Sequence, residues 1–189
     1  LKLRKQMQLE LKRIKHEVGI TFVHVTHDQE EAMTMADTIA VMHDGRIEQL
    51  GTPTELYETP RTAFVAGFLG ISNLLRGTVE GDGAVRLEHG PVVRLPAASG
   101  RTGALSIGIR PEKVRFGTQD ENHLAGEVRE SAYIGVSTQY VVDTRAGAIM
   151  LYVQNAEAGA PSVQPGDQVN LNWSPDATFV VESEEETER

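Results

Sequence analysis

The first 18 residues have the hydrophobic spacing of an amphipathic helix. Apolar side chains recur at Met7, Leu11, Ile14 and Val18, spaced by four, three and four positions, so they share one helix face. We interpret the opposite, basic face as a solvated helix surface rather than a nucleic-acid or membrane contact. Its cationic residues are Lys2, Arg4, Lys5, Lys12, Arg13 and Lys15.

The pattern then changes to that of a strand followed by a helix. Residues 21–25 are β-branched or aromatic around one histidine and predict a buried strand, whereas residues 29–37 are good helix formers without Gly or Pro. Asp28, followed three positions later by Glu31, predicts a capping box at the start of this helix. His27 is therefore expected at the carboxyl end of a strand and the mouth of a helix, where α/β sheets bind ligands.

Residues 38–69 predict a hairpin and two short helices. The candidate elements are a strand at 38–43, an Asp-Gly turn, its partner strand at 46–50, and helices at 52–58 and 61–69. A Thr-Pro dipeptide stands at or before the start of each helix, where threonine caps and proline fits the first turn. Residues 70–73 are then expected to form a domain boundary.

Beyond residue 73 the chain predicts an all-β domain. Short apolar runs alternate with Gly, Pro, Asp and Asn, which is typical of a small barrel or sandwich. The candidate strands are 74–80, 84–88, 92–95, 104–109, 126–133, 136–143, 148–153, 168–173 and 178–182. We expect three parts: 1–72, 73–182 and an acidic, disordered tail at 183–189.

Composition narrows the class of protein. A net charge of −9 argues against a general nucleic-acid binder, and the absence of cysteine excludes disulfides and thiolate chemistry. No run approaches the roughly 18 apolar residues that span a bilayer, so no membrane insertion is expected. Because the chain starts at a leucine already inside a helical pattern, we expect it to be a piece of a longer protein.

The histidines are not all candidates for chemistry. His24 alternates with apolar residues in the predicted strand, so a packed core position is favoured for it. The remaining histidines lack metal-ligand spacing, and no metal is assigned. They are His16, His43, His89 and His123.

Arg110 and Glu112, in the sequence IRPE, form a second candidate site. Arg110 can act as a clamp on a small oxyanion or a partner subunit, or form a salt bridge with Glu112 or another carboxylate. Tyr133, Tyr140 and Trp173 can line a ligand pocket, but aromatic residues in a small barrel are usually core.

Two stretches resemble a known family. The run VTHDQEEAMTMADTIAVMHDGRIEQLGTPTELYETP at 25–60 closely resembles the end of the nucleotide-binding domain of ABC-transporter ATPases. The runs at 106–112, 126–135 and 165–173 resemble the OB-like TOBE barrel of ABC importers, most closely those of the spermidine/putrescine type. The resemblance implies an α+β chain, with a C-terminal α/β piece of the ATPase domain followed by a TOBE barrel.

The resemblance also implies roles and partners. His27 matches the switch histidine that contacts the γ-phosphate of ATP, and Gln29 is a possible assistant. The whole subunit would use ATP and Mg²⁺ and work as a homodimer with transmembrane permease subunits and a periplasmic or extracellular substrate-binding protein. It would be cytoplasmic and peripheral on the inner face of the membrane, importing polyamines.

Key parts of an ATPase are missing from these 189 residues. The chain has no Gly-Lys dipeptide of a phosphate-binding loop and no LSGGQ signature, and its Asp120-Glu121 pair does not follow an apolar strand. We therefore expect this polypeptide alone neither to bind ATP tightly nor to hydrolyse it. The alternative function is a stand-alone barrel that binds a small ligand or oxyanion or serves for dimerisation.

Overall fold

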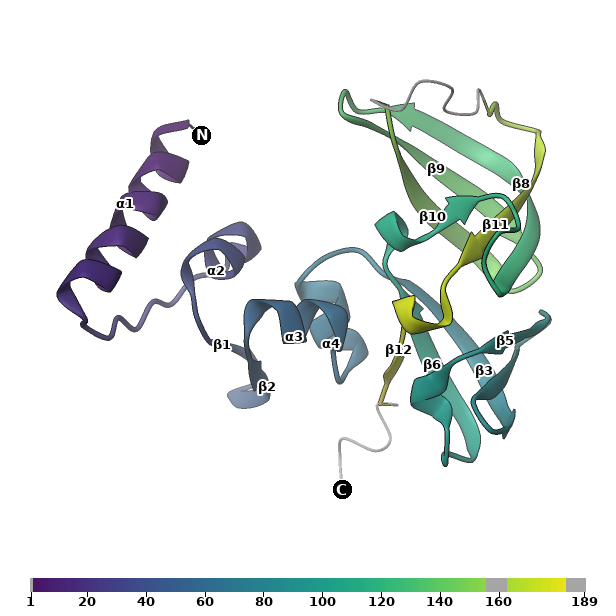
Figure 1. The fold of residues 1–189 in the computed structure, drawn as a ribbon, viewed down its shortest axis with the longest axis horizontal. Helices are drawn as coiled ribbons and strands as arrows, with labels where there is room; N and C mark the ends of the chain where they lie inside the picture. Colours follow the sequence, from purple (N-terminus) through teal and green to yellow (C-terminus); the bar gives the residue numbers. More distant parts are fainter. Residues whose placement is uncertain (1, 156–162, 183–189) are drawn as a thin grey trace.

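A computed structural model describes residues 2–155 and 163–182, so the predicted disordered tail lies outside the described residues. An N-terminal arm of helices and one hairpin leads into a C-terminal pair of β-sheets (Figure 1). The α+β fold class is therefore as predicted. Within the described residues, no helix combines the length and apolarity needed to cross a membrane.

The N-terminal arm contains four helices and one hairpin. In chain order these are α1 (Lys2–Val18), α2 (Gln29–Met35), β1 (Ile39–His43), β2 (Arg46–Gly51), α3 (Pro53–Glu58) and α4 (Ala63–Phe68). The hairpin turns through Asp44 and Gly45, which have φ of 48° and 77°, as the predicted Asp-Gly turn requires. Thr52 caps α3 in a complete capping box with Glu55.

Several local predictions need correction. Residues 21–25 form no strand, and Val23 and Val25 are 90% and 92% exposed. The reason is that a strand needs a neighbour, and no strand of the described chain pairs with this segment. His24 is accordingly exposed, 3.5 Å from a Glu31 carboxylate oxygen, rather than packed in a core. The last helix begins at Ala63 rather than at Arg61, because the Thr62 hydroxyl accepts from the Val65 N–H and caps the helix there.

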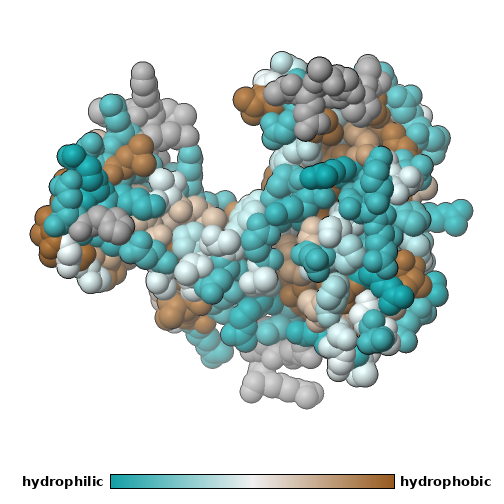
Figure 2. Space-filling model, viewed as in Figure 1, coloured by the Kyte–Doolittle hydropathy of each residue, from teal (hydrophilic) through white to brown (hydrophobic). Residues whose placement is uncertain are grey.

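The packing of α1 also differs from the prediction, although Arg13 of the basic face is exposed as expected. Its polar side faces α2: Gln8 donates to Glu31 (3.3 Å) and the Lys12 ammonium donates to the Thr34 carbonyl (2.8 Å). Lys15 pairs with Asp37. The predicted apolar face is left exposed, and it contributes to the apolar surface of the N-terminal arm in Figure 2.

The C-terminal region consists of two five-stranded antiparallel sheets, ordered β12-β6-β3-β4-β5 and β10-β9-β8-β11-β7. Their strands are β3 (Asn73–Gly81), β4 (Ala84–Leu87), β5 (Val92–Arg94), β6 (Gly103–Ile109), β7 (Arg115–Phe116), β8 (Asn122–Tyr133), β9 (Ser137–Thr144), β10 (Gly147–Gln154), β11 (Gln168–Trp173) and β12 (Thr178–Val181). Among the residues that the structure describes, three 3-10 turns accompany them: η1 (Pro96–Ala98), η2 (Pro111–Lys113) and η3 (Pro175–Ala177).

The two sheets are copies of one unit with an exchanged last strand. Strands β3 to β6 repeat as β8 to β11, and each repeat ends in a proline-led turn and a short strand that joins the other sheet. The repeats share the pattern Asn-x-Leu-x-Gly-x-Val at 73–79 and 122–128. In each, a Cβ on the glycine would lie within 2.6 Å of the neighbouring strand, so only glycine fits.

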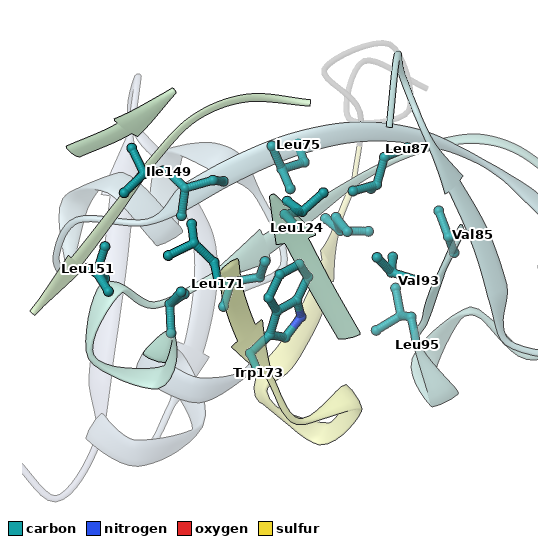
Figure 3. Close-up of a cluster of buried hydrophobic side chains, with 14 of the residues drawn as sticks. Leu75, Val85, Leu87, Val93, Leu95, Leu124, Ile149, Leu151, Leu171 and Trp173 are labelled. Atoms are coloured by element: carbon teal, nitrogen blue, oxygen red, sulfur yellow. The ribbon is translucent and has the colours of Figure 1, made fainter. Parts of the chain in front are cut away.

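One buried core joins both sheets, with Trp173 fully buried at its centre (Figure 3). Two matched asparagines close the barrel. The side chain of Asn73 bonds both the N–H and the C=O of Met150, and Asn122 does the same to Arg94. Each amide therefore replaces one step of a strand ladder between the sheets.

Replacing Asn122 by alanine is expected to destabilise the 189-residue chain by about 1–3 kcal/mol, because the partly buried N–H and C=O of Arg94 lose the partners that the buried Asn122 amide supplies. Urea unfolding followed by circular dichroism measures this. His123→Ala, one residue away and exposed, is the control. Equal stability of the two variants would contradict a closing role for Asn122.

Candidate functional site

His27 is exposed, immediately before the first turn of α2. Its imidazole forms no hydrogen bond or ion pair with any residue that the structure describes. The ring is therefore available to a ligand. Gln29, the second candidate, is the first residue of α2 and is also exposed.

The backbone on both sides of His27 is fixed by a local hydrogen-bond network. The Asp28 carboxylate accepts from the Glu31 N–H (3.1 Å), which is the predicted N-cap. The Thr26 hydroxyl accepts from the Asp28 N–H (3.0 Å) and donates to the Glu31 carboxylate (2.7 Å). Glu31 thus bonds Thr26 where a complete capping box would bond Asp28. The result still ties residues 26–28 to the helix.

Helix α2 rests on a small core separate from that of the barrel. This core contains Ile39 and Val41 from β1, Leu56 from α3, and Val65 and Leu69 from the α4 segment. The apolar residues of α2 that pack against it are Ala32, Met33 and the adjacent Ala36. The position of His27 therefore depends on β1, α3 and α4.

An exposed imidazole held this way can donate a hydrogen bond to a phosphate oxygen as negative charge develops there. Binding a nucleotide needs more than one donor, and the phosphate-binding loop is absent from this sequence. In the described residues, no group of three or more His, Asp or Glu side chains is placed to hold a metal ion.

Arg110 is directed into the protein rather than toward solvent. It is 1% exposed, and its guanidinium donates to main-chain carbonyls of Tyr57 and Ala66 and to the Ser72 hydroxyl. Burial lowers the pKa of Arg110 from its usual value. The Arg110 guanidinium is therefore not open to bind an oxyanion from solvent. Among the residues that the structure describes, it also forms no salt bridge with Glu112.

Glu112 accepts a hydrogen bond from the Tyr57 hydroxyl (2.7 Å). Burial first, and then this bond to Glu112, raise the pKa of Tyr57 well above its ordinary value near 10. The structure thus brings Arg110 and Glu112 together around Tyr57. They lie at the barrel, whereas His27 and Gln29 lie at α2, so the two sequence-predicted sites are separate (Figure 1).

Sequence reasoning missed Tyr57 and Ser72 as partners of Arg110. No signal in the chain pairs them, because they lie 53 and 38 residues away from it. Tyr140 and Trp173 are buried in the barrel core, as aromatic residues of a small barrel are expected to be. Tyr133 is instead 76% exposed at the end of β8.

Comparison with known proteins gives matches over most of the chain. Residues 107–181 match the family model of the TOBE domain. The spermidine/putrescine import ATP-binding protein PotA of Thermobifida fusca (strain YX) is 49% identical, covering 96% of this chain and 50% of that protein. An uncharacterised ABC transporter ATP-binding protein, YdcT of Escherichia coli (strain K12), is 41% identical, covering 93% and 48%.

Among solved structures, the cytoplasmic molybdate-binding protein ModG with molybdate bound is similar at a TM-score of 0.48 and 17% identity, covering 57% of this chain and 94% of that one. This likeness is too weak to carry an inference about ligands. The chain spans about half the length of the curated relatives it matches.

Proposed function

The chain belongs to the ATP-binding subunits of ABC importers that carry a TOBE domain, and we propose that it is the part of such a subunit that presents the switch histidine. In the proposal His27 contacts the γ-phosphate of ATP, and Gln29 assists. ATP and Mg²⁺ are bound by the complete subunit, whose hydrolysis of ATP drives import. Residues 1–72 belong to its ATPase domain and 73–182 to its TOBE barrel.

The placement of the His27 side chain is the main support for this proposal. Its ring is exposed and unengaged within the described chain, while the backbone on both sides of it is anchored by Thr26, Asp28 and Glu31. A histidine that served only to fill a core or to cap its own helix would be buried or hydrogen-bonded to a neighbouring group of the protein. The complete subunit is proposed to act as a homodimer with permease subunits and a substrate-binding protein, at the inner face of the membrane.

We further propose a polyamine as the imported substrate, because the PotA relative that is 49% identical is named a spermidine/putrescine import protein. The test is uptake of labelled spermidine and putrescine by cells that carry or lack the complete transporter. Uptake that depends on the transporter supports a polyamine. Transporter-dependent uptake of iron or a sugar instead would overturn this specificity and leave the ATPase assignment standing.

The 189-residue chain alone is expected to show no Mg²⁺-dependent ATP hydrolysis above the rate of a buffer blank, because it lacks the phosphate-binding loop. Phosphate release by the purified chain measures this, with the complete subunit and its permease as the active reference. Turnover by the chain alone that disappears with His27→Ala would show that the nucleotide is bound without that loop, contrary to the proposal.

The position of Arg110 does not support the alternative function, a stand-alone barrel that binds an oxyanion. Its guanidinium is buried and is already bonded to carbonyl and hydroxyl oxygens of the protein itself.

A further inference from the structure

Arg110 caps two helices of the N-terminal arm from within the barrel. It follows the last residue of β6, and its guanidinium reaches the carbonyls of Tyr57 (2.8 Å) and Ala66 (2.9 Å). Both carbonyls lie in the final turns of α3 and α4, where the helix supplies no amide partner and the helix dipole favours a cation. One side chain therefore supplies a hydrogen-bond donor at the C-terminal end of both helices.

Further contacts fasten the same two helices to the barrel. The Arg110 guanidinium lies 4.0 Å from the centre of the Tyr57 ring, a cation–π distance. Ala66 packs with Phe179 and Val181 of β12. The Glu182 N–H donates to the Arg61 carbonyl (2.7 Å) between the helices. We call this set of contacts around Arg110 the joint.

The barrel itself does not require an arginine at this point. In the second repeat the matching stretch after β11 is Ser174-Pro175-Asp176, in place of Arg110-Pro111-Glu112. Ser174 is followed by the same kind of 3-10 turn and exchanged strand as Arg110. Because serine suffices for that geometry, the guanidinium serves the contact with α3 and α4.

The joint is connected to His27 through packed elements. Leu56 of α3 and Val65 of α4 belong to the core on which Ala32 and Met33 of α2 pack. A shift of α3 and α4 relative to the barrel would therefore move the core on which α2 packs, and α2 directly follows His27 and its neighbour Asp28. In Figure 1 these two helices lie between the barrel and the hairpin that follows α2.

From these contacts we propose that Arg110 is a positioning residue for ATP turnover: by fixing α3 and α4 to the barrel, it sets the placement of α2 and of His27. This inference rests on the proposed function of His27. It gives the TOBE barrel a direct mechanical connection to the hydrolytic site within one chain.

The test uses the complete subunit assembled with its permease. Arg110→Lys keeps the positive charge but loses the planar fork that reaches two carbonyls, so kcat for ATP is expected to fall roughly tenfold, with little change in the KM for ATP. Arg86→Lys is the matched control, since Arg86 also makes a forked contact, to Glu80, but on the barrel surface away from the joint. It should retain full activity.

Combining each variant with His27→Ala separates positioning from general damage. If Arg110 acts through His27, Arg110→Lys causes no further loss of kcat in the His27→Ala background. The same tenfold loss in both backgrounds would overturn the inference. Unchanged turnover in His27→Ala alone would instead reject the proposed function of His27. Ser72→Ala, which removes one acceptor 2.7 Å from the guanidinium, provides a milder variant if Arg110→Lys does not fold.

Discussion

Replacing His27 by alanine in the complete subunit should lower the rate of ATP hydrolysis by about 100- to 1,000-fold, the cost of removing one donor aimed at developing charge. The ring is exposed and has no partner in the described chain, so its loss removes the proposed contact to the nucleotide and no contact among the described residues. Phosphate release by the subunit assembled with its permease measures the effect.

Folding and specificity controls accompany this measurement. His27→Ala should leave the circular dichroism spectrum and the urea midpoint unchanged, because the anchoring bonds of the loop are made by Thr26, Asp28 and Glu31. His123→Ala, an exposed histidine of the barrel, should keep full turnover. A His27→Ala subunit with more than a tenth of normal turnover would contradict the assignment of the switch histidine.

The sequence predicted best where the cause of structure is local. The Asp28 and Thr52 caps act over three residues, and both are found where the pattern placed them. The Asp44-Gly45 turn likewise follows from two adjacent residues that accept positive φ. His27 could be located at a helix start for the same reason, since the helix signal beside it is local.

Predictions failed where the structure of a segment depends on residues that are not its neighbours in the chain. Residues 21–25 have strand composition but no neighbouring strand within the described chain, and composition alone does not reveal that. The burial of Arg110 depends on Tyr57 and Ala66, which lie 53 and 44 residues away from it. The pattern shared by 73–79 and 122–128 is present in the sequence. That it marks equivalent strands of two repeats becomes clear only when the two sheets are compared.

Trp173→Ala is expected to destabilise the 189-residue chain by about 3–5 kcal/mol, the largest stability effect in the barrel. Trp173 is fully buried in the core shared by both sheets, and its indole N–H donates to the Thr178 hydroxyl (3.0 Å) at the start of the exchanged strand β12. Truncation opens a cavity between the sheets and removes a bond that holds β12. Urea unfolding followed by circular dichroism measures the loss.

Two comparison variants separate the contribution of the ring volume of Trp173 from that of its indole hydrogen bond, and from the effect of losing an exposed aromatic side chain. Trp173→Phe keeps most of the ring volume but leaves the Thr178 hydroxyl without its indole donor. Its free energy of unfolding should therefore lie between those of wild type and Trp173→Ala. Tyr133→Ala, at a residue 76% exposed, should change stability by less than about 0.5 kcal/mol. A cost below about 1 kcal/mol for Trp173→Ala would mean that the two sheets do not share one cooperative core.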